Sequence, residues 1–432
     1  MPTVDLLSLR ATWLERWPEA LEAWSRYTRL RSPILCLGDD EAKAEGLTES
    51  FAMIRLDDQS VVVNLAQVAK LGLEDYPREI LAHEIGHHVL APANLTDHAR
   101  MIARMRWALP TIEAQAPMVA NLYSDLLIND RLQRSAGLRL AEVYKKIGSG
   151  RSPGSVWLLY MRIYEILWSL TRGTLGARKL EDRLEGDAQL GARLIRSYAR
   201  DWLDGAGRFA ALLLPHLLED RESQALMKRW FDTQHAGKGG DPAGLSDEDA
   251  DERSGAIHPS LDPDLADLPI DDTSAQDEAA KASVRGAGES RGQARDPFQF
   301  GEILRAAGID LDDHEAAVRY YRERATRQLI PFPTRRVELS ADPLPEGLEP
   351  WTVGEPIDQA DWLQTVLQSP HVVPGLTTVQ RVWGTTEGHE VKRTPIDLDL
   401  YIDSSGSMAD PQRSLSYPAL AGAILCLSAL RA

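Results

Sequence analysis

Hydrophobic and polar positions follow two different patterns along the first half of the chain. Two β-branched runs, Phe51 to Leu56 and Ser60 to Val68, are separated by a polar turn, which predicts a hairpin or two sheet strands. A helix is predicted next, because Pro77 suits a first helical position and Pro92 marks a stop. Further helical patterns follow at Asp97 to Leu109, Pro117 to Arg134, Ser155 to Leu170, and in amphipathic stretches up to about Phe231. The first half is therefore expected to be rich in helices with a small sheet.

The stretch from Ala236 to Asp296 has a different composition, rich in Asp, Glu, Ser, Gly and Ala and without apolar periodicity. Such a segment cannot bury enough surface to offset its ordering entropy, so we expect a disordered acidic linker, with an ordered acidic loop as the alternative. Beyond it the patterns predict a charged helix at Asp312 to Gln328, strands at Thr377 to Trp383 and Ile396 to Ile402, and a helix from Arg413 to Ala432.

Length, charge and cysteine content narrow the class of protein. A chain of 432 residues is long enough for two or three domains. Its formal net charge of −17 argues against a nucleic-acid partner, which requires a basic surface. The two cysteines have no partners at metal-ligand or disulfide-framework spacing, and neither a signal peptide nor a membrane-spanning stretch is recognisable. The expected compartment is the reduced cytoplasm, with no membrane partner.

Two histidines, His83 and His87, lie four positions apart within the helix predicted after Pro77. Residues at this spacing share one helical face, so both imidazoles can reach a single metal ion. Glu84 follows the first histidine and could hold and deprotonate a water molecule on that metal. The pattern therefore predicts a zinc site that hydrolyses peptide bonds, with Glu84 as the catalytic base. The alternative is a chance occurrence of the pattern on a helical scaffold.

A third metal ligand is predicted on the helix at Pro117 to Arg134. Asn121, Asp125 and Asn129 recur every four positions in an otherwise apolar segment. A polar stripe within an apolar helix costs desolvation free energy unless something satisfies it, and a metal ion would do so. We expect Asp125 to complete the zinc site, with Asn121 and Asn129 orienting the ligands from behind. Asp130 is the alternative ligand, and a solvent-facing stripe on a surface helix is the alternative explanation.

Three neighbouring residues are predicted to have lesser roles. His88 lies one residue beyond the ligand face and is expected at the surface or in support of a ligand, and His98 is expected to be an ordinary histidine. Gly86 costs about 1 kcal/mol of helix stability relative to alanine. This cost predicts that another backbone or a substrate passes close to it.

A second candidate metal site, for Mg²⁺, follows the strand predicted at Ile396 to Ile402. Asp403, Ser405 and Ser407 offer hard oxygen atoms, which suit Mg²⁺ at the carboxyl end of a strand. One carboxylate and two hydroxyls would leave this ion mostly hydrated, so we expect weak binding. A plain turn between strand and helix is the alternative.

The Asp-x-Ser-x-Ser loop resembles the metal-ion-dependent adhesion site of von Willebrand factor A (VWA) domains, which have a doubly wound, Rossmann-like α/β fold. Since that fold needs further strands after Ala432, the resemblance implies that only its beginning is present. Together with the histidine helix and the stripe ending at Asn129, the loop makes the chain similar to a bacterial family that combines a metallopeptidase domain with a VWA-like domain. The similarity covers roughly Val61 to Arg134 and Thr377 to Ala432.

The resemblance implies an α+β fold with an α-rich, zincin-like N-terminal domain and a small sheet. The expected divisions are a metallopeptidase domain with a helical extension at 1–235, the linker at 236–296, a lead-in segment at 297–376 and the start of a VWA domain at 377–432. His83, His87 and Asp125 would be the zinc ligands and Glu84 the general base. Related VWA proteins are often partnered with MoxR-type AAA+ ATPases, so an ATPase partner is implied beside a protein or peptide substrate.

Two functions from different classes are compatible with these motifs. The first is a zinc-dependent peptidase coupled to a VWA interaction domain. The alternative is a non-catalytic adaptor whose metal only joins two helices and whose VWA loop recruits a partner. A closed site with four ligands would favour the adaptor, and an open site in a groove would favour the enzyme.

Overall fold

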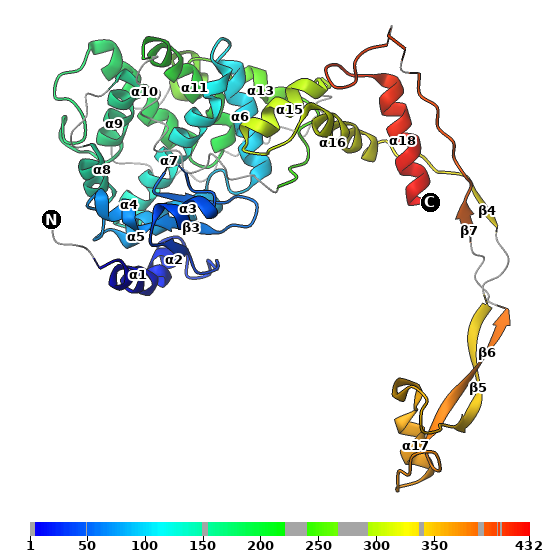
Figure 1. The fold of residues 1–432 in the computed structure, drawn as a ribbon. Coiled ribbons are helices and arrows are strands. Elements are labelled where there is room, and N and C mark those ends of the chain that lie inside the picture. Colours follow the sequence, from blue (N-terminus) through cyan, green and yellow to red (C-terminus); the bar gives the residue numbers. More distant parts are fainter. Residues whose placement is uncertain are drawn as a thin grey trace. The chain divides into compact units, whose positions relative to one another are not determined.

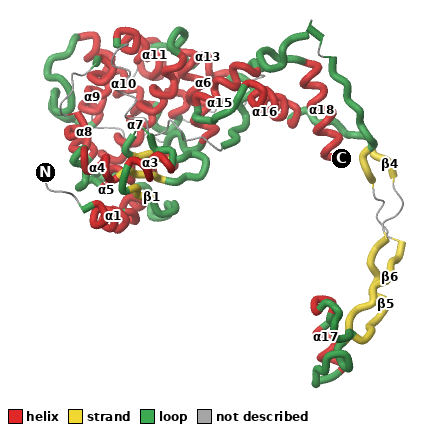
Figure 2. Tube along the Cα trace, in the orientation of Figure 1, coloured by secondary structure: helices red, strands yellow, loops and turns green. Residues whose placement is uncertain are grey.

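The structure is a computed structural model in which the placement of most of the chain is described. The described residues are 5–48, 50–148, 154–220, 240–266, 293–336, 341–387, 393–403, 405–406 and 408–432. They divide into two compact units, the first comprising Met1–Glu323 with Gly406–Ser416 and the second Arg324–Ser405 with Tyr417–Ala432. The fold is mixed α/β and mainly helical, with a small sheet in the first unit, which confirms the coarse fold prediction (Figures 1 and 2). Within the described residues, no helix combines the length and the hydrophobicity that crossing a membrane requires.

The small sheet consists of β1 (Ile34–Cys36), β2 (Ala52–Ile54) and β3 (Val61–Asn64) in the order β1-β3-β2. β2 and β3 pair antiparallel, so the prediction of two neighbouring strands is confirmed. The second predicted run is a strand only as far as Asn64, and Leu65 to Val68 instead begin helix α4 (Leu65–Lys70). β1 runs parallel to β3 and was not predicted from the sequence. All residues of β2 and β3 are buried, because helices cover this sheet. The nearly continuous apolar sequence of both strands is typical of strands covered in this way.

Helices make up most of the first unit, and the predicted ones are confirmed to within a few residues. They are α1 (Leu6–Glu15), α2 (Trp17–Glu22), α3 (Asp39–Ala44), α4 (Leu65–Lys70), α5 (Pro77–Val89), α6 (Leu95–Ala108), α7 (Ala116–Ser135), α8 (Leu140–Gly148), α9 (Ser155–Leu167), α10 (Asp182–Ser197), α11 (Trp202–Glu219), α13 (Ala250–Ser254), α14 (Pro263–Ala266), α15 (Pro297–Ala306) and most of α16 (Asp313–Thr326), with short 3₁₀ turns at Glu113–Gln115 and Pro259–Leu261. The stretch predicted to continue to Phe231 lies outside the described residues beyond Asp220.

Helix α7 lies at the centre of this unit, in contact with α5, α6, α8, α9 and α11. Its polar residues Asn121, Asp125 and Asn129 are all buried, so the stripe is not a solvent-facing one. Gly86 allows α5 to approach α7 closely, since a Cβ atom there would lie 2.4 Å from Ile128 Cγ2. The neighbours that require glycine are therefore side chains, not the backbone or substrate predicted from the sequence.

Residues 240–266 and 293–296 differ from the disordered linker predicted for this stretch. They contain α13 and α14, and Arg104 of α6 reaches Asp249 at 3.0 Å. Asp262 is fully buried and accepts a hydrogen bond from Arg208 Nε at 2.6 Å. Composition misled the prediction, because it does not show that Asp249 and Asp262 pair with arginines of α6 and α11, nor that Asp262 is buried. The first unit thus continues past the boundary expected at residue 235, while residues 267–292 lie outside the described part.

The second unit contains a long antiparallel ribbon of β5 (Ala341–Pro350) and β6 (Val379–Glu387). Its other elements are β4 (Thr334–Arg336), paired with β7 (Arg393–Pro395), a 3₁₀ turn at Ile357–Gln359, α17 (Trp362–Gln368) and α18 (Tyr417–Arg431). The strand predicted at Thr377 to Trp383 corresponds to β6, and the helix predicted from Arg413 to α18.

The strand predicted at Ile396 to Ile402 is wrong. β7 ends at Pro395, and the following residues have no strand assignment. A strand requires a neighbouring strand for its backbone hydrogen bonds, and an alternating apolar pattern alone does not supply one. Ile402 instead lies close to α18, since a Cβ on Gly422 would be 2.5 Å from Ile402 Cδ1. The predicted beginning of a doubly wound α/β sheet is therefore not formed among the described residues.

Candidate metal centre

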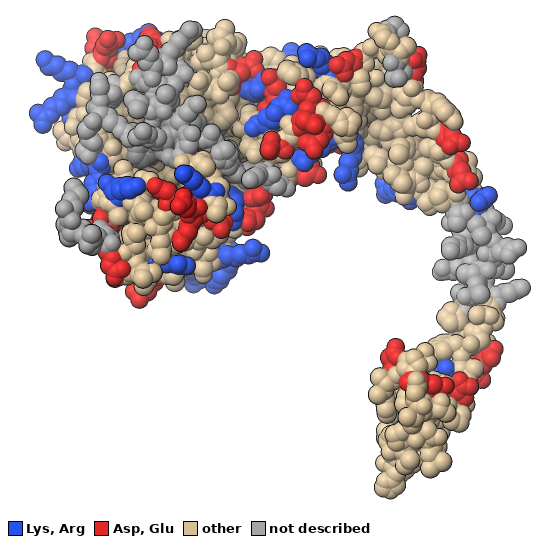
Figure 3. Space-filling view, viewed as in Figure 1, with Lys and Arg blue, Asp and Glu red and all other residues tan. Residues whose placement is uncertain are grey.

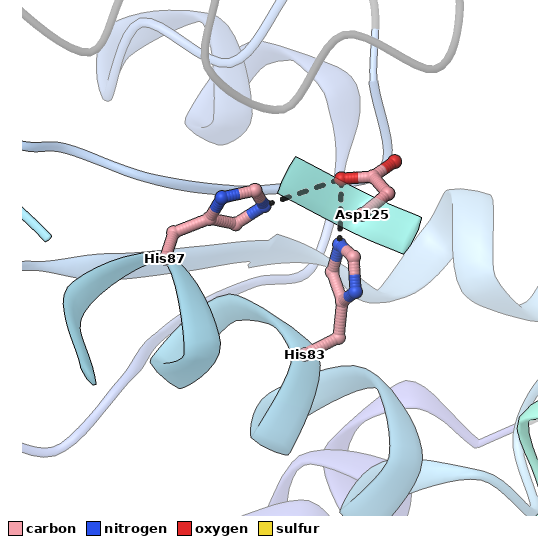
Figure 4. Close-up of side chains that lie close together, drawn as sticks. All are labelled: His83, His87 and Asp125. Atoms are coloured by element: carbon pink, nitrogen blue, oxygen red, sulfur yellow. Dashed lines mark ion pairs between the residues drawn. The ribbon is translucent and has the colours of Figure 1, made fainter. Parts of the chain in front are cut away.

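Helices α5 and α7 bring His83, His87 and Asp125 together, as Figure 4 shows. The Asp125 Oδ1 atom lies 3.6 Å from His83 Nε2 and 3.5 Å from His87 Nε2. All three candidate ligand atoms lie within 4.8 Å of one another, and among the described residues this is the one His/Cys/Asp/Glu group that meets this criterion. The three residues predicted as ligands from their spacing therefore converge on one point.

The two imidazole rings are held by their other nitrogen atoms. His83 Nδ1 lies 2.8 Å from Asn129 Oδ1, and His87 Nδ1 lies 3.1 Å from the Ala91 carbonyl oxygen. Both partners are acceptors, so each ring donates its Nδ1–H and directs the Nε2 lone pair toward Asp125. This is the arrangement in which histidines bind zinc in proteins, and two imidazole nitrogens with one carboxylate fit a divalent ion of that kind.

Asp125 is positioned through its second oxygen atom. Oδ2 accepts hydrogen bonds from Asn121 Nδ2 at 3.2 Å and from the Tyr160 hydroxyl at 3.4 Å. Oδ1 is consequently left facing the two histidines. The predicted supporting roles of Asn121 and Asn129 agree with these contacts, one residue holding the carboxylate and the other holding His83.

Three tyrosines behind the centre were missed by the sequence reasoning. Asn129 Nδ2 donates hydrogen bonds to the Tyr144 hydroxyl at 3.0 Å and to the Tyr164 hydroxyl at 2.8 Å, and the Tyr160 and Tyr164 oxygens are 2.9 Å apart. Burial raises the pKa of Tyr160 and Tyr164 well above the ordinary value for tyrosine, so both stay protonated donors. The only signal in the sequence was the spacing of Tyr160 and Tyr164, four positions apart in an apolar helix.

A pocket opens beside the three ligands. It encloses about 630 Å³, counting the part open to solvent, and His83, Glu84 and Asp125 form part of its wall. Glu84 is only 2% exposed and lines the same pocket as His83 and Asp125. Among the described residues, the centre is thus a group of three candidate ligands at the side of a cavity, with no fourth His, Cys, Asp or Glu in the group.

The alternative third ligand, Asp130, lies outside the cluster. Its carboxylate is paired with Arg134, whose Nε donates to Oδ1 at 2.8 Å. Burial raises the pKa of Asp130 despite the opposing effect of Arg134. Neither His88 nor His98 belongs to the cluster, although His98 is buried and burial lowers the pKa of His88.

The candidate magnesium loop is described only in part. The Ser405 backbone N–H donates to Asp403 Oδ1 at 2.9 Å, a local contact typical of turns that aspartate begins. Ser407 lies outside the described residues. The structure thus places two of the three predicted residues next to each other, in an exposed segment.

No known protein family, curated protein or solved structure matches the chain.

Proposed function

We propose that the chain is a zinc-dependent peptidase whose first unit is a zincin-like catalytic domain. The observation that carries the proposal is the cluster of His83, His87 and Asp125, two of which, His83 and Asp125, line a pocket together with Glu84. Zinc sites that only stabilise a fold usually have four protein ligands, whereas catalytic sites have three and leave one position open. The three-ligand centre beside a cavity favours the enzyme over the adaptor.

The residues of the chain would divide the hydrolysis among them. When bound, zinc supplies a Lewis acid that activates water and polarises a carbonyl group. Glu84 takes a proton from the attacking water, whose oxygen bonds to the carbonyl carbon of the substrate. The C–N bond then breaks, and Glu84 returns the proton to the leaving nitrogen, which gives one carboxylic acid and one amine. His83 and His87 keep their orientation through their Nδ1 hydrogen bonds.

A role in partner binding is proposed for the second unit. Its β5–β6–α17 part exposes large apolar side chains, among them Leu363 at 66% and Leu367 at 70%. Figure 3 shows this part as mainly uncharged surface, with acidic residues over the ribbon. Contiguous exposed apolar surface is typical of interaction sites. The motif resemblance supports two further proposals for this part of the chain. The first is a VWA-like role with a MoxR-type AAA+ ATPase as the partner, and the second is Mg²⁺ binding at Asp403, Ser405 and Ser407.

The test of the peptidase proposal uses the purified chain and a Glu84→Gln variant. We expect about one zinc per chain in both proteins by elemental analysis, because this substitution leaves the three ligands in place. Cleavage of a mixture of quenched fluorescent peptides should fall about 10²- to 10⁴-fold in the variant, since the proton acceptor is lost. Equal cleavage by both proteins would remove Glu84 from the mechanism, and a wild-type protein without zinc would overturn the proposal itself.

A further inference from the structure

The pocket beside the metal ligands is lined mainly by apolar side chains from several elements. Phe51 directly precedes β2, Leu122 comes from α7, Val143 and Ile147 come from α8, and Trp157 comes from α9. Val143 and Ile147 are 4% and 7% exposed, so these side chains are fixed by packing around the cavity. A pocket of this kind binds an apolar group by removing its surface from water.

Besides Glu84 and Asp125 at the metal centre, the described lining of the pocket contains one more carboxylate, Glu79, which is paired with a cation. Glu79 lies one helical turn before His83 and is 3% exposed. Its Oε1 atom accepts hydrogen bonds from Arg139 Nε at 3.1 Å and from the Arg139 backbone N–H at 3.2 Å. The charge of this pair is balanced within the protein, so Glu79 itself offers little attraction to a charged side chain.

We propose that this pocket is the specificity site of the peptidase, and that it receives a large apolar side chain from a residue next to the scissile bond. The substrates would then be peptides with leucine, phenylalanine or a similar residue at that position. His83, Glu84 and Asp125 form the same wall, so a side chain seated in the pocket brings the adjacent carbonyl group to the metal ligands and the base. This inference rests on the proposed peptidase function.

The first experiment measures kcat/KM of the zinc-loaded protein on quenched fluorescent peptides. The peptides are identical except for Gly, Ala, Leu, Phe, Lys or Asp at one of the two positions that flank the cleaved bond. We expect Leu or Phe to exceed Gly by roughly 10- to 100-fold at one of these positions. Lys and Asp should be no better than Ala. Equal rates for all six residues, or a preference for Lys that would point to Glu79, would overturn the proposal.

The second experiment fills the pocket. Val143→Phe places a ring inside the cavity, so the ratio of kcat/KM for the Phe peptide over the Ala peptide should fall at least about tenfold. Lys145→Phe adds the same ring on the exposed face of α8 and should leave this ratio unchanged. An unchanged ratio in a Val143→Phe protein that still holds its zinc would show that the side chain binds elsewhere.

A binding measurement separates this inference from the peptidase proposal. The probes are two peptides in which a phosphinate replaces the scissile amide, one with Phe and one with Gly at the position that the first experiment identifies. If no peptide is cleaved in that experiment, a Phe and Gly pair is made for each of the two flanking positions. Calorimetry should give a Kd about tenfold or more lower for the Phe probe, and Val143→Phe should abolish the difference. If no peptide is cleaved but the difference persists, the pocket assignment stands and the peptidase proposal fails. If peptides are cleaved but the two probes bind equally, the peptidase proposal stands and the pocket assignment fails.

Discussion

The two units differ in how far their leucine side chains are exposed to solvent. In the first unit, Leu126 of α7, the helix that carries Asp125, is fully buried. In the second, Leu367 of the similarly helical α17 is 70% exposed. The first unit thus uses buried apolar residues to stabilise a preformed centre. The β5–β6–α17 part of the second unit instead exposes apolar residues to solvent. The first arrangement suits chemistry, which needs fixed geometry, and the second suits association, which needs accessible surface.

The same contrast applies to polar residues. Buried charges of the first unit are paired, for example Arg208 with Asp262 and Arg295 with Glu252. In the β5–β6–α17 part, buried polar groups are few among the described residues, and Thr365 and Thr378 serve mainly to join α17 and the ribbon by local hydrogen bonds. A two-stranded ribbon of this kind has marginal stability on its own. We therefore expect the two units to respond differently to metal and to substitution.

The largest effect is expected from removal of a metal ligand. Asp125→Ala should weaken zinc binding by more than the roughly 10- to 100-fold that loss of a supporting residue causes, and cleavage should be lost with the metal. Zinc should also slow hydrogen exchange in α5 and α7 of the wild type, because a ligand that binds only the folded state stabilises it. Peptides from α17 should not respond.

The control is Asp130→Ala, which removes a buried carboxylate of the same helix that pairs with Arg134. It should leave zinc affinity nearly unchanged. If Asp130→Ala loses zinc and Asp125→Ala keeps it, the assigned ligand is wrong.

A smaller effect is expected from matched leucine substitutions. Leu126→Ala should lower the free energy of unfolding of the first unit by about 2–5 kcal/mol, since it removes buried methyl groups and leaves a cavity. Leu367→Ala should change stability by no more than about 0.5 kcal/mol, because its side chain is already exposed. Denaturant unfolding followed by hydrogen exchange measures both. Similar losses in the two variants would show that the surface of α17 is covered in solution.

The smallest effect is expected from two helical glycines. Gly86→Ala should destabilise the first unit by about 1–3 kcal/mol, because the new Cβ would lie 2.4 Å from Ile128 Cγ2 and 2.7 Å from Trp24 Cζ2. Gly186 of α10 has no neighbouring atom within 4 Å of such a Cβ, so Gly186→Ala should stabilise by about 0.5–1 kcal/mol. Thermal unfolding distinguishes the two signs. Stabilisation by both substitutions would mean that α5 and α7 are less tightly packed than described.

Sequence reasoning succeeded where the signals are local. Pro77 begins α5, and helical periodicity places His83 and His87 on one face and Asp125 on the buried face of α7. These inferences need only the geometry of one helix at a time, together with the cost of burying polar groups.

It failed where the partner lies far along the chain. β1 is recognisable only through its parallel pairing with β3, and the role of Tyr164 becomes clear only through its contact with Asn129, 35 positions earlier. Asp262 looked like part of a solvated acidic stretch because its partner Arg208 belongs to α11. Composition describes how a segment interacts with water, and it omits the countercharges that the folded chain supplies.

The hydrogen bonds behind the metal centre run in one direction. His83 donates to Asn129, whose amide donates to Tyr164, and since Tyr160 donates its single proton to Asp125, Tyr164 must donate to Tyr160. A group that donates a hydrogen bond becomes more electron-rich, and a group that accepts one becomes less so. His83 donates and Asp125 accepts, so the His83 nitrogen becomes a stronger Lewis base and the Asp125 oxygen a weaker one. The hydrogen bonds thereby shift binding strength from the carboxylate oxygen to the imidazole nitrogen. Such a centre would discriminate against hard cations such as magnesium and calcium, and in favour of zinc, before any difference in ionic size is considered.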